Sequence, residues 1–202
     1  MSISLATIAE LAWFTVLNPR AAARRLINMQ LPDSAGWLLL ALVATASALL
    51  TLINFSLIPV DQLRKMSPET VFAIREALQN PIMTAVFQAI FLLLVVVCVH
   101  RLGRWQGGKG TFADALLLTG WLQFVLVGLQ IAQIVALLIL PPFAEVLGLA
   151  GLVLSFWLLS HFVAELHGFK SAGVVFFAIV GVIVGVAIGL SMALLAVFGV
   201  GA

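Results

Sequence analysis

The residues that come nearest to a known chemical motif form the glycine-rich stretch GRWQGGKGTF over 103–112. Gly103, Gly108 and Lys109 match the phosphate-binding motif G-x-x-x-x-G-K-[ST], but Gly110 occupies the place of its hydroxyl residue. A phosphate-binding loop joins a buried strand to a helix in a soluble domain that also supplies Mg²⁺ ligands. This stretch lies instead between two apolar runs, so we do not expect it to bind a nucleotide.

We interpret the same stretch as a short turn that ends one apolar helix and begins the next. Thr111 is followed three residues later by Asp114, which is the T-x-x-D form of a helix-capping signature. The expected role of the turn is therefore structural, with Thr111 as the N-cap of the following helix.

A second polar stretch, SHFVAELHGFK, places ionisable residues near the end of another apolar run. His161 and Glu165 are four residues apart and therefore share a helix face, and His167 follows just beyond. Such a cluster suggests either a metal or proton-relay site, or an interfacial ion pair or polar cap. We favour the ion pair or cap, because one helix supplies too few metal ligands and the ends of spans are readily hydrated.

The polar groups placed deeper in the apolar runs are amides rather than charges. Gln123 and Gln130 are seven residues apart, so they lie on one helix face. The full set is Asn54, Gln88, Gln123, Gln130 and Gln133. We expect these amides to form hydrogen bonds between helices, and a polar substrate path is the alternative. Because no nucleophile–base pair or metal set accompanies them, we expect no catalytic residue, cofactor or metal.

The composition is that of an integral membrane protein. Hydrophobic residues make up 63% of the chain and charged residues 9%, with a mean hydropathy of +1.22, whereas soluble proteins are about half apolar and a quarter charged. The net charge of +2 is too small to indicate a nucleic-acid partner. The single cysteine, Cys98, excludes an intramolecular disulfide.

Five apolar runs are long enough to cross the ~30 Å hydrocarbon core, which takes about 20 helical residues. We therefore predict an all-α membrane protein, a bundle of five transmembrane helices that forms a single domain over 1–202. The predicted spans are 36–58, 82–99, 115–139, 146–164 and 172–198.

The first 35 residues are predicted to form an amphipathic helical segment at the membrane surface. Apolar residues recur at helical spacing over 3–17, and Asn18-Pro19 is typical of the start of a second short helix. This second helix carries a basic surface that we expect to face anionic headgroups, formed by Arg20, Arg24 and Arg25.

The distribution of basic residues predicts the orientation of the chain. With the N-terminus in the cytoplasm, seven basic residues fall on the cytoplasmic side and three on the other, as the positive-inside rule favours. The cytoplasmic set is Arg20, Arg24, Arg25, Arg101, Arg104, Lys109 and Lys170, and the opposite set is Arg64, Lys65 and Arg75. The C-terminus is then predicted on the opposite side.

The last span carries small residues at four-residue intervals: Gly181, Gly185, Gly189 and Ala193. Small residues with this spacing let two helix backbones approach closely, so we expect a helix-packing face. The partner is either another span of this chain or a second copy.

The order of these parts resembles a known family. The chain is similar to a bacterial member of the Yip (Ypt-interacting protein) family in five features taken in order. These are an N-terminal amphipathic stretch in which Asn-Pro starts a second helix, five spans, GGKGTFADAL before the third span, the pair Gly120-Trp121, and ELHGFKSA between the last two spans. The resemblance covers nearly the whole chain. It implies a multi-span membrane protein, and for a bacterial member the inner (cytoplasmic) membrane.

The resemblance also implies a class of partner. Eukaryotic members of the family lie in Golgi and endoplasmic reticulum membranes, bind prenylated Rab-type GTPases and one another, and act in vesicle formation. This chain has no tyrosine and so lacks the tyrosine-bearing motifs of those members. We therefore do not carry GTPase binding over, and the resemblance supplies no catalytic residue.

These observations predict a non-enzymatic membrane scaffold or adaptor. Its expected partners are membrane lipids and other membrane proteins or a second copy, and no nucleic acid. The alternative function is a small transporter or channel that uses the amide face around Gln123 and Gln130.

Overall fold

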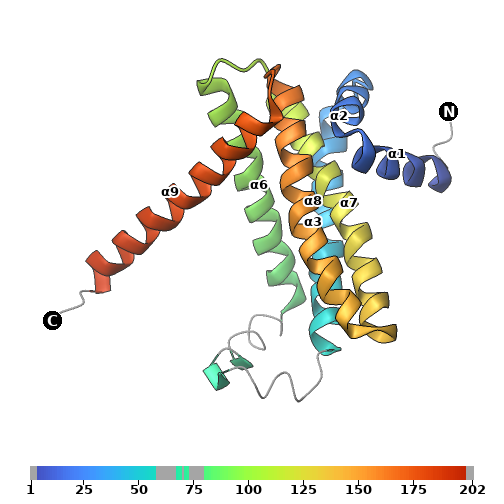
Figure 1. Ribbon diagram of the computed structural model, residues 1–202, viewed down its shortest axis with the longest axis vertical. Helices are drawn as coiled ribbons and strands as arrows, with labels where there is room; N and C mark the ends of the chain where they lie inside the picture. The colour runs from blue at the N-terminus through green and yellow to red at the C-terminus, as the bar shows by residue number, and fades with distance from the viewer. Residues whose placement is uncertain (1–3, 58–66, 70, 73–79, 199–202) are drawn as a thin grey trace.

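The computed structural model describes residues 4–57, 67–69, 71–72 and 80–198, and within them the chain is helical (Figure 1). The main helices are α1 (Leu5–Leu17), α2 (Pro19–Asn28), α3 (Asp33–Ser56), α6 (Pro81–Trp105), α7 (Phe112–Ile139), α8 (Pro141–His167) and α9 (Ala172–Phe198). Five of these, from α3 to α9, are long and apolar enough to cross a membrane. The structure thus confirms the all-helical fold class with five candidate spans and a helical N-terminal segment.

The helices extend beyond most of the predicted spans because polar residues continue them. α6 runs to Trp105, so Gly103 is helical and the turn before α7 is shorter than the stretch predicted from the sequence. Pro81 and Pro141 are the first residues of α6 and α8. The N–H of a first helical residue has no partner within the helix, so proline, which lacks this N–H, loses no hydrogen bond there. Thr111 caps α7 as predicted, because its Oγ1 accepts a hydrogen bond of 3.1 Å from the N–H of Asp114.

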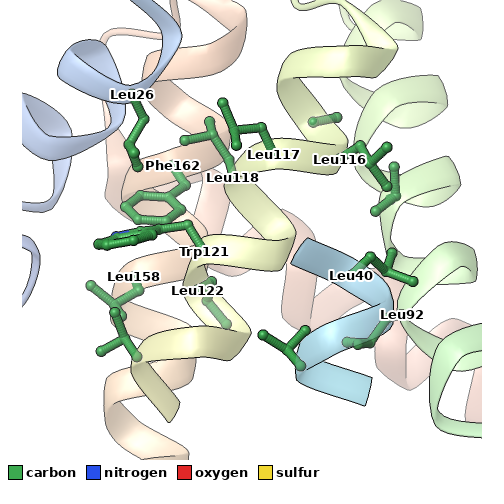
Figure 2. Close-up of a cluster of buried hydrophobic side chains, with 14 of the residues drawn as sticks. Leu26, Leu40, Leu92, Leu116, Leu117, Leu118, Trp121, Leu122, Leu158 and Phe162 are labelled. Carbon is green, nitrogen blue, oxygen red and sulfur yellow. The ribbon is translucent and has the colours of Figure 1, made fainter. Parts of the chain in front are cut away.

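The N-terminal half of α7 is the centre of the bundle. Every residue over 115–122 is buried, so α7 must have neighbours on all sides there. Figure 2 shows those neighbours: leucines of α2, α3 and α6, and Leu158 and Phe162 of α8, surround Leu116, Leu118 and Trp121 of α7.

Two glycines allow α3 and α7 to pack closely. A Cβ at Gly36 of α3 would lie 3.1 Å from Leu116 of α7, and a Cβ at Gly120 of α7 would lie 3.1 Å from Leu39 of α3. Each helix therefore places a leucine over the other's glycine. Close contact of this kind is the main attraction between helices in lipid, where no hydrophobic effect drives them together.

The N-terminal helices pack against one end of the bundle. α2 buries one face, with Ala22, Ala23 and Leu26, against α8 and α7. α1 lies crosswise to the long helices (Figure 1), and its Trp13 is 68% exposed, as suits a residue of the headgroup zone.

A buried hydrogen bond ties α1 to α7. The indole Nε1 of Trp121 donates to Oγ1 of Thr15 over 2.9 Å, and the same hydroxyl donates to the Leu11 carbonyl over 2.7 Å. Thr15 is fully buried and Trp121 is 8% exposed. The bond therefore satisfies the indole N–H at a position that water does not reach.

We expect Thr15→Val to destabilise the protein by about 1–3 kcal/mol, because it leaves the indole N–H of Trp121 buried without an acceptor. The free energy of unfolding in detergent micelles, followed by circular dichroism, measures the loss. Thr45→Val is the matched control, since the Thr45 hydroxyl is exposed on α3 and donates to the Ala41 carbonyl of its own helix. Equal stability of the two variants would contradict the role given to Thr15.

Candidate functional site at the basic end of the bundle

Seven basic residues gather at one end of the bundle. They come from α2, from the end of α6, from the turn before α7 and from the turn between α8 and α9: Arg20, Arg24, Arg25, Arg101, Arg104, Lys109 and Lys170. These elements meet at the top of Figure 1, and we call this region the basic end. The other three basic residues of the chain, Arg64, Lys65 and Arg75, lie outside the described residues.

Arg20 and Arg24 attach α2 to the end of α8. The Nη2 of Arg20 donates to the carbonyl oxygens of Phe169 and Lys170, each over 3.1 Å. The Nε of Arg24 donates to Oε1 of Glu165 over 2.7 Å, and this hydrogen bond raises the pKa of Arg24 above its ordinary value. These two arginines therefore bind the protein itself. The side chain of Arg24 is still 67% exposed, so contact of this surface with lipid headgroups stays a prediction. Arg25 is exposed.

His167, the last residue of α8, is held between glycines of the stretch over 103–112. A Cβ at Gly103 would lie 2.1 Å from Nε2 of the imidazole, and a Cβ at Gly108 would lie 2.3 Å from Nδ1. A Cβ at Gly110 would lie 2.5 Å from Leu166 and 3.0 Å from the ring. Because no side chain fits at these three positions, the glycines form a cradle for His167, which is 3% exposed.

Both ring nitrogens of His167 are hydrogen bonded within this glycine cradle. The N–H of Gly110 donates to Nδ1 over 3.3 Å, and Nε2 lies 3.1 Å from the Val99 carbonyl of α6. Since Nδ1 accepts, Nε2 carries the proton, and the imidazole is neutral. The ring thus joins α6, the turn and α8 without placing a charge in the packed region.

The glycine cradle explains why the sequence stretch resembles a phosphate-binding loop. Its glycines are required for close approach to a side chain of this chain, and the Gly110 amide that a phosphate would use bonds the imidazole. Gly107 has a φ of 85°, a left-handed value that favours glycine at the turn itself. The pairing of these glycines with His167 was not predicted from the sequence, although a histidine directly before Gly168 at the end of an apolar run is a signal that could have suggested it.

The predicted polar cluster is not one site, because its three side chains have different partners. His161 Nδ1 lies 2.8 Å from the Trp157 carbonyl, one turn earlier in α8, and its ring lies 4.1 Å from the Trp157 ring. Glu165 pairs with Arg24 and His167 occupies the glycine cradle. Among the residues that the structure describes, no group of three or more His, Cys, Asp or Glu residues is arranged to hold a metal ion.

The amide face of α7 lies against neighbouring helices. Gln123 Nε2 donates to the Ser47 hydroxyl of α3 over 3.0 Å, and Gln130 Nε2 lies at a longer 3.5 Å from the Thr51 hydroxyl. The Nε2 of Gln133 would lie 3.0 Å from a Cβ at Gly148 of α8, so that amide packs on a glycine. The two remaining intramembrane amides, Asn54 of α3 and Gln88 of α6, are half-buried.

The small residues of α9 lie on a part of the helix that leaves the bundle. Early in α9, Val175 is 7% exposed and packs near Val163 and Ala164 of α8. Further along, α9 diverges from α6 and α8 (Figure 1), and every residue over 181–193 is exposed. The stripe of Gly181, Gly185, Gly189 and Ala193 is therefore exposed, and a Cβ at any of its three glycines would meet nothing within 4 Å.

We expect Gly103→Ala to destabilise the protein by at least about 2 kcal/mol, because its Cβ would overlap the His167 ring and break the glycine cradle. Thermal unfolding in detergent measures the change. Gly128→Ala is the control: its Cβ would meet nothing within 4 Å, so stability should be unchanged or rise by up to about 1 kcal/mol. Combining Gly103→Ala with His167→Ala should give a smaller loss than the sum of the two, and an additive result would argue against the cradle.

Comparison with known proteins places the chain in a family. The family model of the Yip1 domain matches residues 13–195, which cover the described helices from within α1 to the exposed part of α9. No curated protein and no solved structure matches the chain significantly. Proteins of the Yip1 family are generally non-enzymatic membrane proteins. The match confirms the resemblance found in the sequence, and the chain belongs to the Yip1 family of multi-span integral membrane proteins.

Proposed function

We propose that this protein is a non-enzymatic scaffold or adaptor that binds another membrane protein, or a second copy of itself, along α9. The observation that carries the proposal is the exposed stripe of Gly181, Gly185, Gly189 and Ala193 on the part of α9 that leaves the bundle.

Exposure of apolar residues alone would carry no such argument, because lipid tails cover an apolar helix as well as another helix does. The glycines of the bundle and those of α9 differ in what lies against them. Gly36 and Gly120 each lie under a leucine of the neighbouring helix, and Gly103 lies against His167. Gly181 and Gly185 have the same capacity for close approach and no neighbour among the described residues.

A glycine in the middle of a helix lowers the stability of the helix by roughly 1 kcal/mol relative to alanine. Several glycines with no packing partner therefore destabilise the helix that contains them. Close packing against a second helix compensates for this loss, since small residues bring backbones within van der Waals contact. A transmembrane helix of a partner protein, or α9 of a second copy, fits a stripe of this kind.

We further infer that the protein resides in a bacterial inner membrane with the basic end in the cytoplasm. Arg25, Arg101, Arg104, Lys109 and Lys170 are exposed at that end, where the positive-inside rule places such residues on the cytoplasmic side. The N-terminus is then cytoplasmic, and the five spans put the C-terminus on the opposite side.

Site-specific photocrosslinking in native membranes tests the proposed partner site. A photoreactive residue at Ile188, on the glycine face, should give a crosslinked product larger than the 21.6 kDa chain, whereas one at Ile183, on the opposite face, should not. Gly185→Leu should lower the crosslinking yield at Ile188 about tenfold or more, because the leucine keeps the backbones apart. The matched control is Ala187→Leu, which adds the same bulk to the opposite face and should leave the yield unchanged.

The proposal would be contradicted if the crosslinking yield at Ile188 were the same with Gly185→Leu as without it. It would also be contradicted if only the uncrosslinked chain were recovered. A product at the mass of two chains identifies self-association, and any other mass identifies a different partner.

Cysteine labelling tests the orientation. In a Cys98→Ser background, Lys109→Cys at the basic end should react with a membrane-impermeant maleimide only after cell lysis. Leu140→Cys, at the exposed junction of α7 and α8 on the opposite side, should react in intact cells. The reverse pattern would overturn the inferred orientation.

A further inference from the structure

The basic end contains a cleft between the last turns of α6 and the start of α7. Its volume is about 540 Å³, and it is lined by Val97, His100, Arg101, Arg104 and Phe112. Cationic groups therefore stand beside apolar side chains in one hollow, which is the combination that a lipid with a charged headgroup requires.

The two arginines of this headgroup cleft are available to bind a ligand. Both are exposed, and among the residues that the structure describes the single ion pair is Arg24 with Glu165. Arg101 and Arg104 are three residues apart, so they lie on one face of α6 and direct two positive charges toward the same space. A second hollow of about 430 Å³ lies beside Arg24 and Arg25, but Arg24 is already neutralised there by Glu165.

His100 adds an unsatisfied polar group to the wall of the headgroup cleft. Its ring lies edge-on to Phe112, with centroids 5.8 Å apart, and its Nδ1 is shielded from solvent without a hydrogen-bond partner among the described residues. Buried polar atoms normally have a partner, so an unpartnered nitrogen beside a cleft indicates a ligand group that can supply one.

Tryptophans beside the cleft indicate its depth. Trp37 of α3 lies 6.3 Å from the Phe112 ring and is 47% exposed, and Trp105, next to Arg104, is 83% exposed. Tryptophan is enriched at the boundary between headgroups and hydrocarbon. The cleft is therefore at the level where lipid phosphates lie, and Val97 is on the hydrocarbon side of Arg101, one helical turn deeper.

We propose that the headgroup cleft binds the phosphate of an anionic phospholipid such as phosphatidylglycerol. Arg101 and Arg104 contact the phosphate oxygens, His100 provides a polar contact, and Val97 and Phe112 lie against the upper part of an acyl chain. The ligand is a bilayer lipid rather than a soluble phosphate ester, because the cleft pairs its charges with apolar walls at the membrane boundary.

Native mass spectrometry of the purified full chain in detergent tests this proposal. Phosphatidylglycerol and phosphatidylcholine with identical acyl chains serve as probes, and we expect one phosphatidylglycerol to bind at least tenfold more tightly. The double substitution of Arg101→Gln and Arg104→Gln should weaken phosphatidylglycerol binding about thirtyfold, since each basic residue near a headgroup contributes about fivefold. Both positions are exposed, so the fold should be retained, and circular dichroism checks this.

The charge-matched control replaces Lys109 and Lys170 with Gln, which removes two positive charges from the same end but outside the cleft. It should bind phosphatidylglycerol as the original chain does. Equal losses in the two double variants would overturn the proposal in favour of diffuse attraction to the basic end, and no loss in the arginine variant would also overturn it.

Two further arms distinguish the ligand source and the role of His100. Millimolar glycerol phosphate should fail to displace phosphatidylglycerol, and full displacement would assign the cleft to a soluble phosphate ester instead.

His100→Phe keeps a ring against Phe112 and should weaken phosphatidylglycerol binding about threefold, the effect of losing one modest hydrogen bond. Unchanged binding in that variant would remove the imidazole from the proposed site.

Discussion

The arrangement of the basic end depends on one buried side chain, the neutral imidazole of His167. It is hydrogen bonded to Gly110 of the turn and to Val99 of α6, so it fixes the end of α8 against the helix pair α6 and α7. The contacts that hold α2 build on that position. Glu165 and the carbonyls of Phe169 and Lys170, which Arg24 and Arg20 bind, lie within a few residues of His167. The docking of α2, and through it the placement of α1 over Trp121, therefore depends on where α8 ends.

Packing in this protein follows the rules of the bilayer rather than those of a soluble core. Lipid tails are as apolar as leucine, so helices associate where small residues or polar links provide something that lipid does not. α3 and α7 have both, with Gly36 and Gly120 under leucines and the Gln123–Ser47 hydrogen bond between them. α9 has the small residues and, beyond its first turns, no helix among the described residues against them. The helices α3, α6, α7 and α8 therefore form a packed four-helix core, whereas the glycines of α9 remain exposed and can pack against another helix.

The sequence was sufficient to predict the parts of the fold that follow from hydropathy and local capping. Runs of apolar residues identify the spans directly, and Thr111 with Asp114 identifies the start of α7. Helix ends were less accurate, because polar residues such as Arg101 and Arg104 continue α6 beyond the apolar run. The contacts between distant segments were not predictable. Arg20 and Arg24 are indistinguishable by sequence from lipid-facing residues, and their partners lie more than 140 positions along the chain.

The glycine-rich stretch over 103–112 resembles a phosphate-binding loop in sequence but differs from one in what its backbone binds. A phosphate-binding loop uses backbone N–H groups that its glycines leave accessible, and here the Gly110 N–H donates to an imidazole instead. The turn encloses His167, and the N–H groups of Gly107, Gly108 and Gly110 are already hydrogen bonded within the protein. The groups placed to recognise an anion at this end are therefore side chains. Arg20 and Arg24 are bound to α8 and to the turn after it, which leaves Arg101 and Arg104 of α6, beside the headgroup cleft, as the paired charges that can provide it.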